Sequence, residues 1–202
     1  MKNSVREPRQ ERSIEKKNKI IAAGYELFSE NGYYGTNTAE IARRAGVSTG
    51  IVYGYFADKR DILVCVLEIY INKVCEPFFR LLDGLRSPID FNAVIPEALD
   101  LIIEMHKSNR NMHEALHSLS GTDEAVRNQF IALEDEVTVK IAERLSNLGV
   151  KLDNPMEKIH FAMDMVQSFS HEYIYDKHEY INYAAMRNIV INSLSALFVQ
   201  PK

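Results

Sequence analysis

The chain has 202 residues, of which 46% are hydrophobic and 26% charged, a composition typical of a globular protein that can bury a core. It contains no run of 18 apolar residues, which excludes a membrane span, and its charged N-terminus lacks an apolar signal region, which favours a cytoplasmic protein. Two cysteines, Cys65 and Cys75, are too few for a disulfide scaffold and are expected to pack as small hydrophobes.

Charge is distributed unevenly along the chain. Although the net charge is -4, residues 1–60 carry 11 basic and 7 acidic residues, and the remaining residues carry 13 and 21. A basic segment joined to an acidic one is typical of a protein in which only one part meets phosphates. Chance clustering near the N-terminus is the alternative explanation, and charge alone does not decide between them.

The first predicted helix begins near Ile14, after a polar stretch over residues 1–13 that we expect to be a disordered arm. Apolar residues then recur at three- and four-residue steps, which predicts one buried helix face. These residues are Ile20, Ile21, Ala23, Gly24, Leu27 and Phe28. Asn31-Gly32 is suited to end this helix in a left-handed conformation.

Two short helices are predicted next. Thr36-Asn37-Thr38 offers capping side chains for a helix that Gly46 interrupts after about two turns. Ser48 or Thr49 can cap a third helix that runs through Tyr55.

Asp58 can cap a fourth helix, with Asp61 as its capping-box partner. Pro77 and the segment from Gly84 to Pro88 mark an end or a bend of this helix.

The rest of the chain is predicted to be helical throughout. No segment sustains the alternation of apolar and polar residues that a strand requires, so the fold class is all-α. The expected helices cover residues 92–107, 110–119, 123–148, 155–176 and 181–198.

Residues 38–56 carry the functional argument. Two short helices flank a turn at Gly46, whose backbone freedom such a turn needs. Ile41, Ala45, Val47, Val52 and Phe56 can form one apolar seam between the helices. This arrangement is that of a helix-turn-helix, whose second helix lies in the DNA major groove with its N-terminal residues at base edges.

From Ile20 to Leu63 the sequence resembles the DNA-binding domain of the tetracycline-repressor (TetR) family of regulators. The matching residues are Ala22-Ala23, Leu27-Phe28, Gly32-Tyr33, Thr36, Thr38, Ile41-Ala42, Ala45-Gly46-Val47-Ser48, Gly50, Val52-Tyr53, Tyr55-Phe56 and Lys59. Two residues depart from the family pattern. Thr49 stands where a longer side chain is common, and Gly54 stands where a larger one is usual.

The resemblance implies a set of DNA contacts and no cofactor, metal or catalytic residue. The implied contacts are Thr38, Ser48, Thr49, Gly50, Tyr53, Tyr55 and Lys59. The amides at the start of the helix near Asp58, with Lys59 beside them, can hold a phosphate. The alternative for the aromatic residues is a core position, which we expect for Phe56.

The family also implies the domain organisation. It predicts a three-helix DNA-binding domain over residues 14–60 and a larger helical domain for effector binding and dimerisation over residues 61–202. The protein would be a homodimer through its last two long helices, which binds a palindromic double-stranded DNA operator and is released by a small-molecule effector. The expected effector is apolar or aromatic, because the candidate pocket residues are Met105, Met112, His113, His117, Phe130 and Met163.

Apolar residues of the last two long helices are compatible with this dimer, although an intramolecular core would use the same residues. They are Phe161, Met165, Phe169, Ile174, Ile189, Ile191, Leu194 and Leu197.

Two other functions remain open. His113-Glu114-x-x-His117 matches the zinc-peptidase pattern, with Asp123 as a candidate third ligand. Peptidases with this pattern resemble each other in holding the substrate along the edge of a sheet, and no strand is predicted in this chain. His106, His113 and His117 would be metal ligands in a milder version of this hypothesis. The other alternative is a DNA-binding adaptor whose C-terminal part binds a protein partner.

Overall fold

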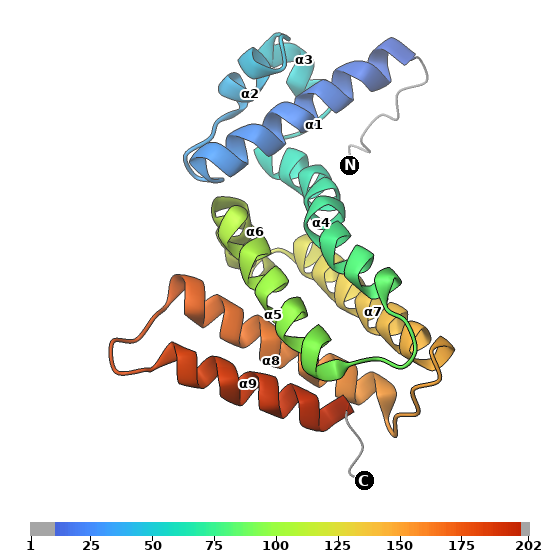
Figure 1. Cartoon of the computed structure of the whole chain (residues 1–202). Coiled ribbons are helices and arrows are strands. Elements are labelled where there is room, and N and C mark those ends of the chain that lie inside the picture. Colours follow the sequence, from blue (N-terminus) through green and yellow to red (C-terminus); the bar gives the residue numbers. More distant parts are fainter. Residues whose placement is uncertain (1–10, 199–202) are drawn as a thin grey trace. The chain divides into compact units, whose positions relative to one another are not determined.

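In a computed structural model of the protein, residues 11–198 are described and form nine helices without a strand among them (Figure 1). They are α1 (Glu11–Asn31), α2 (Thr38–Arg44), α3 (Thr49–Tyr53), α4 (Lys59–Gly84), α5 (Phe91–Ser108), α6 (Arg110–Ser120), α7 (Glu124–Asn147), α8 (Pro155–Tyr175) and α9 (Tyr183–Phe198). The prediction of an all-α fold is confirmed for this part of the chain. None of its helices combines the length and the hydropathy that crossing a membrane requires.

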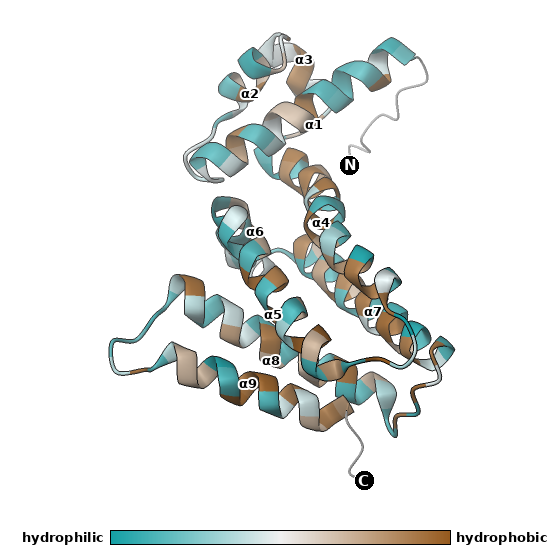
Figure 2. Ribbon diagram, in the orientation of Figure 1, coloured by the Kyte–Doolittle hydropathy of each residue, from teal (hydrophilic) through white to brown (hydrophobic). Residues whose placement is uncertain are grey.

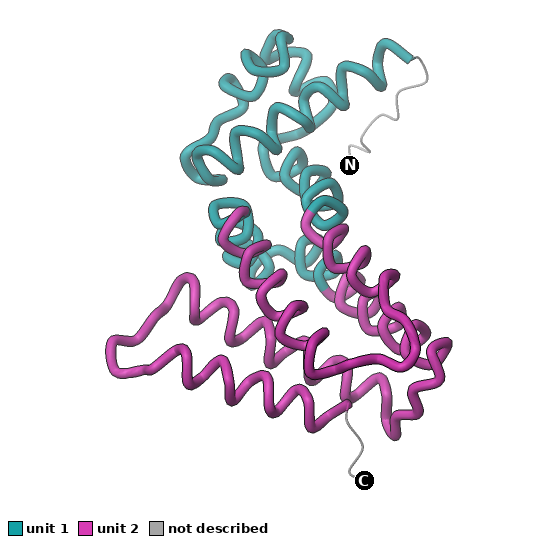
Figure 3. Tube along the Cα trace, in the orientation of Figure 1, with its two compact units in different colours: residues 1–73, 109–130 teal, residues 74–108, 131–202 magenta. Residues whose placement is uncertain are grey.

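The chain divides into two compact units, shown in separate colours in Figure 3. The first unit holds residues 1–73 and 109–130, and the second holds residues 74–108 and 131–202. Residues 14–60 therefore fall in the first unit, together with the first part of α4, α6 and the start of α7. Of the predicted arm over residues 1–13, residues 1–10 lie outside the described residues, and Glu11 to Ser13 belong to α1.

In the first unit, α1 buries the face that its periodicity predicts. Its buried residues are Ile20, Ile21, Ala23, Gly24, Leu27 and Phe28. Gly24 lies where α1 approaches α4, because a Cβ built on it would be only 2.6 Å from Cγ2 of Ile62. Only glycine allows the two helices to come this close.

Side-chain caps begin the next helices of the first unit. Asn37 and Glu40 form a reciprocal capping box at the start of α2, in which Oδ1 of Asn37 accepts from the Glu40 amide at 3.0 Å. Asp58 accepts hydrogen bonds from the Arg60 and Asp61 amides at the start of α4. Asp61 accepts in turn from the amide of Ala57 at 2.9 Å, whereas the predicted capping box would use the amide of the next residue, Asp58.

Apolar residues recur along α4 (Figure 2). The helix continues through Pro77 and ends at Gly84, so the predicted end lies at Gly84 and not at Pro77. A proline in a helix removes one backbone hydrogen bond and is tolerated when side-chain packing offsets that loss. Leu82, near the end of α4, is buried.

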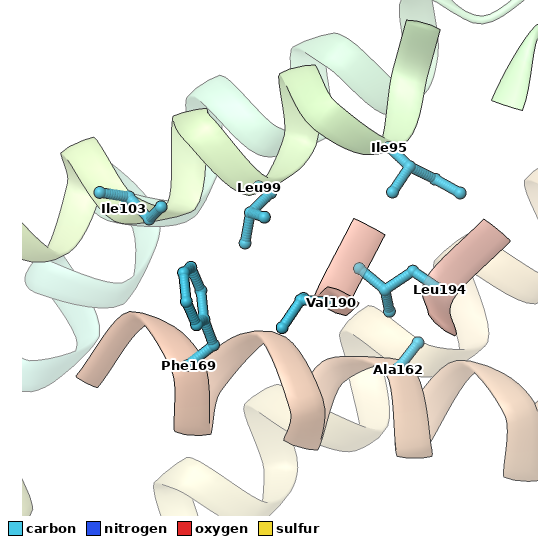
Figure 4. Close-up of a cluster of buried hydrophobic side chains, with 7 residues drawn as sticks. All are labelled: Ile95, Leu99, Ile103, Ala162, Phe169, Val190 and Leu194. Atoms are coloured by element: carbon cyan, nitrogen blue, oxygen red, sulfur yellow. The ribbon is translucent and has the colours of Figure 1, made fainter. Parts of the chain in front are cut away.

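The second unit is centred on a cluster of buried side chains from α5, α8 and α9 (Figure 4). Its members are Ile95, Leu99, Ile103, Ala162, Phe169, Val190 and Leu194. Phe169 and Leu194 are thus intramolecular core residues, which removes them from the surface expected at a dimer interface. Phe161 and Ile189, by contrast, are 55% and 64% exposed.

Candidate nucleic-acid interface

The turn between α2 and α3 is set by backbone conformation and one cap. Gly46 has φ +68°, and a Cβ built on it would meet nothing within 4 Å, so the conformation rather than space demands glycine. The amide of Val47 donates to the Ala42 carbonyl at 3.0 Å. Ser48 then begins α3, because its Oγ accepts from the Ile51 amide at 3.3 Å.

One side of this helix pair is core. Ile41, Ala42, Val52 and Phe56 are each at most 2% exposed. The predicted seam is therefore formed by Ile41, Val52 and Phe56, and the core position expected for Phe56 is confirmed. With its apolar side fixed in this way, α3 has one opposite face available to a ligand.

That face presents small residues and one aromatic ring. A Cβ on Gly50 would meet only Oγ of Ser48, at 4.0 Å, so the backbone of α3 is open there. Tyr53 is 57% exposed at the end of the helix. Ser48 is also exposed, whereas Thr49 and Thr38 are half-buried. An exposed helix start with small side chains allows close approach to base edges.

Two of the predicted contacts are engaged within the protein. The hydroxyls of Tyr55 and Ser13 lie 2.7 Å apart, which connects α1 to the segment after α3. The ammonium of Lys59 donates to the carbonyls of Tyr33 and Thr36 at 2.8 and 2.9 Å and lies 4.3 Å from the centre of the Tyr33 ring. Lys59 therefore fixes the loop that leads into α2.

The start of α4 differs from the predicted phosphate site. Oδ1 of Asp58 accepts from the amides of Arg60 and Asp61 at 2.8 and 3.1 Å. A carboxylate already occupies the position that a phosphate oxygen would take, and its charge repels an anion. The prediction that these amides hold a phosphate is therefore wrong for Arg60 and Asp61.

An ion pair missed by the sequence analysis links distant parts of the first unit. Nη2 of Arg60 donates to Oδ1 of Asp123 at 2.9 Å, and Nε of Arg60 donates to Oδ2. The hydrogen bonds from Arg60 lower the pKa of Asp123 to about 2. Because 63 residues separate the two side chains, no local sequence pattern points to the pair.

The residues of the zinc-peptidase pattern do not converge on a metal site. Glu114 pairs with Arg110 at 3.1 Å, and Asp123 is engaged by Arg60. The rings of His113 and His117 lie 4.2 Å apart. Within residues 11–198, no three His, Cys, Asp or Glu side chains are grouped to hold a metal ion.

The candidate effector residues are divided between the units. In the first unit, Met112 and His113 are buried, and the ring of His117 lies 5.3 Å from that of Phe130. The second unit holds Met105 and also Met163, whose sulfur accepts from the Thr138 hydroxyl at 3.4 Å. The structure thus groups His113, His117 and Phe130.

A capped short helix, held by a glycine turn against α2 and exposing Gly50 and Tyr53, defines a helix-turn-helix DNA-binding module. Comparison with known proteins supports this assignment of a helix-turn-helix. The family model of bacterial regulatory proteins of the tetR family matches residues 20–66.

Two proteins with similar sequences are described as regulators. The HTH-type transcriptional regulator HbdR of Aromatoleum sp. (strain CIB) is 33% identical over 125 residues, which are 58% of this chain and 55% of that protein. The fatty acid metabolism regulator protein of Bacillus subtilis (strain 168) is 34% identical over 89 residues, 44% of this chain and 42% of that one. The chain thus spans about half the length of these curated relatives.

The fold has solved counterparts. A TetR-family transcriptional regulator from Mesorhizobium loti MAFF303099 superposes with a TM-score of 0.71 over 93% of this chain and 97% of that chain, at 18% identity. At that identity the likeness shows the fold. Residues 20–66 thus match the tetR-family model, and the chain as a whole shares the fold of a solved TetR-family regulator.

Proposed function

We propose that the protein is a transcriptional repressor that binds a palindromic operator and is released by a small molecule. The observation that carries this proposal is the Ser48-capped α3, which exposes Gly50 and Tyr53 within the segment that matches the family. In this proposal residues 14–60 read DNA, and residues 61–202 bind the effector and form the dimer. A protein with this role acts in the cytoplasm, where a bacterial chromosome lies.

Each proposed contact has a chemical role. Ser48, Thr49 and Gly50 lie at the start of α3, where side chains and backbone reach base edges in the major groove. Tyr53 presents its hydroxyl to a phosphate. Thr38, the first residue of α2, takes a neighbouring phosphate. Tyr55 and Lys59, which form intramolecular bonds in this structure, complete the proposed contact set.

Dimerisation through α8 and α9 is supported by their exposed apolar residues. Phe161 on α8 and Ile189 on α9 are more than half exposed, although both helices already contribute to a core. Two such helices from each subunit would form a four-helix bundle. A two-fold dimer would place two α3 helices about 34–36 Å apart, as successive major grooves on one face of DNA require.

Release by an effector needs a ligand that binds one conformation better than the other. A hundredfold loss of operator affinity requires a difference of about 2.7 kcal/mol in binding free energy. The proposed ligand is apolar or aromatic, because methionine and aromatic side chains dominate the candidate set. Within the first unit that set is Met112, His113, His117 and Phe130.

The test is selection of bound sequences from random DNA, followed by anisotropy titrations of the enriched fragment at fixed salt. A palindromic enriched sequence is expected, and Tyr53→Ala should weaken its binding by about 1–2 kcal/mol through loss of one phosphate contact. Tyr180→Ala is the matched control, because Tyr180 is an 81% exposed tyrosine of the second unit, outside the helix-turn-helix and the loop before it. If the wild-type protein enriches no sequence, the proposal is wrong.

A further inference from the structure

The corner formed by α6 and the start of α7 is bonded to residues on both sides of the helix-turn-helix, at the end of α1 and at the start of α4. Nδ2 of Asn111 donates to the carbonyls of Ser29 and Glu30 at 2.9 and 3.1 Å. These carbonyls belong to the last turn of α1, which has no helical donors for them. Asp123, at the other end of the corner, binds Arg60 in the first turn of α4.

The ion pair is connected to the loop that begins α2. Arg60 follows Lys59, whose ammonium holds the carbonyls of Tyr33 and Thr36. Thr36 in turn precedes the Asn37 cap of α2. A continuous series of charged hydrogen bonds and adjacent residues therefore runs from Asp123 to the start of the helix-turn-helix.

Asp123 makes two separable sets of contacts. Its Oδ1 accepts from the amides of Ala125 and Val126 at 3.0 and 3.2 Å and so begins α7. Both carboxylate oxygens also accept from Arg60, and the Asp123 side chain is only 10% exposed. Asparagine caps helices as well as aspartate does but carries no charge. The Asp123→Asn substitution therefore retains the cap and weakens the link to α4.

We propose that Asp123 is a positioning residue for operator binding, which holds α4 and the loop over residues 33–36 in the DNA-binding geometry through Arg60. This inference rests on the proposed function. Asp123 touches no DNA itself in this role, and it is distinct from the contacts on α3. Its effect on DNA passes through the bidentate pair, whose planar geometry fixes orientation as well as distance.

The experiment is a double-mutant cycle on the full chain with Asp123→Asn and Arg60→Gln, measured as the Kd for the operator fragment enriched by the wild-type protein. Each single variant is expected to raise Kd by about three- to tenfold, and the double variant no further than either alone. Glu114→Gln is the matched control, since it removes one carboxylate from an exposed pair within α6 and should leave Kd unchanged.

Hydrogen exchange of the DNA-free protein gives a second readout. Asp123→Asn should accelerate exchange over residues 33–56 but leave the buried middle of α1 as slow as in the wild type. A purely structural role would lower the melting temperature yet leave Kd and this local exchange unchanged, and that result would overturn the inference. Additive effects of the two variants on Kd would overturn it as well.

The two proposals can fail separately. If the wild-type protein enriches no DNA, the proposed function fails, and exchange over residues 33–56 alone decides the positioning role. Faster exchange there in Asp123→Asn, with Glu114→Gln unchanged, would still support a link from Asp123 to the helix-turn-helix. Unchanged exchange would refute it.

Discussion

Gly24 provides a sharp test of how α1 packs on α4. A glycine inside a helix is ordinarily less stable than alanine by about 0.5–1 kcal/mol, so Gly24→Ala should stabilise α1 in isolation. In the folded protein, however, the added Cβ would lie 2.6 Å from Cγ2 of Ile62, 3.5 Å from Val66 and 3.6 Å from Phe28. Phe28, Ile62 and Val66 are each fully buried, so the contact cannot be relieved at the surface.

The expected net effect is destabilisation. Overpacking a core costs about 1–3 kcal/mol, which exceeds the helix-propensity gain. We therefore expect Gly24→Ala to lower the free energy of unfolding by about 1–2 kcal/mol, measured by urea denaturation followed by far-ultraviolet circular dichroism. Gly84→Ala is the control, because a Cβ there meets nothing within 4 Å, and it should change stability by less than about 0.5 kcal/mol.

A second substitution identifies the clash. Ile62→Leu keeps the side-chain volume but removes the methyl group on Cβ that the new atom would meet. In that background Gly24→Ala should be neutral or stabilising, so that the two changes couple by about 1–2 kcal/mol. Equal destabilisation in both backgrounds would refute the reasoning, as would a stabilising effect of Gly24→Ala in the wild-type protein.

Two further predictions concern buried polar contacts of the first unit. Asp123 has its pKa lowered from 3.8 to about 2 in the folded protein, so its pair with Arg60 stabilises the fold above about pH 4, and this contribution disappears as the pH falls toward 2. At neutral pH we expect Asp123→Asn to lower the free energy of unfolding by about 1 kcal/mol, a small value because Arg60 is partly exposed. This difference from the wild type should shrink as the pH falls over that range, measured by urea denaturation at a series of acidic pH values. A difference that stays constant would contradict the assignment. Thr36 is 2% exposed, and its hydroxyl lies within hydrogen-bond distance of the Leu27 and Gly32 carbonyls. Thr36→Val should therefore lower the free energy of unfolding by about 1–2 kcal/mol. An unchanged midpoint of urea denaturation would show that these carbonyls do not need the hydroxyl.

Local sequence patterns predicted the helices because the buried face and the ends of a helix depend mostly on nearby residues. The apolar positions of α1 repeat with the period of a helix, and that period alone selects its buried face. The helices after Ser108 begin and end within about two residues of the predicted bounds, because Gly121, Pro155 and similar residues interrupt them. Pro77 shows the limit of this reasoning, since whether a proline ends a helix depends on packing that lies outside the local sequence.

The predicted DNA contacts show a second limit. The exposure of Ser48, Gly50 and Tyr53 could be predicted because a capped helix start has a defined exposed side, and their contacts with DNA remain a proposal. Sequence could not show that the Tyr55 hydroxyl meets Ser13, or that Lys59 binds two backbone carbonyls. Those partners are 42, 26 and 23 residues away, and a hydroxyl or an ammonium group is equally suited to a phosphate or to a carbonyl oxygen.

The same limit applies to the charge of the DNA-binding segment. Counting residues 1–60 gives a net charge of +4, but several of these cations are engaged internally. Arg44 pairs with Glu26 and Glu30, Lys59 holds the loop before α2, and Arg60 holds Asp123. In the proposed complex, phosphates would therefore meet a surface whose basic side chains partly serve the fold, and we expect a change that frees one of these cations to alter stability and DNA affinity together.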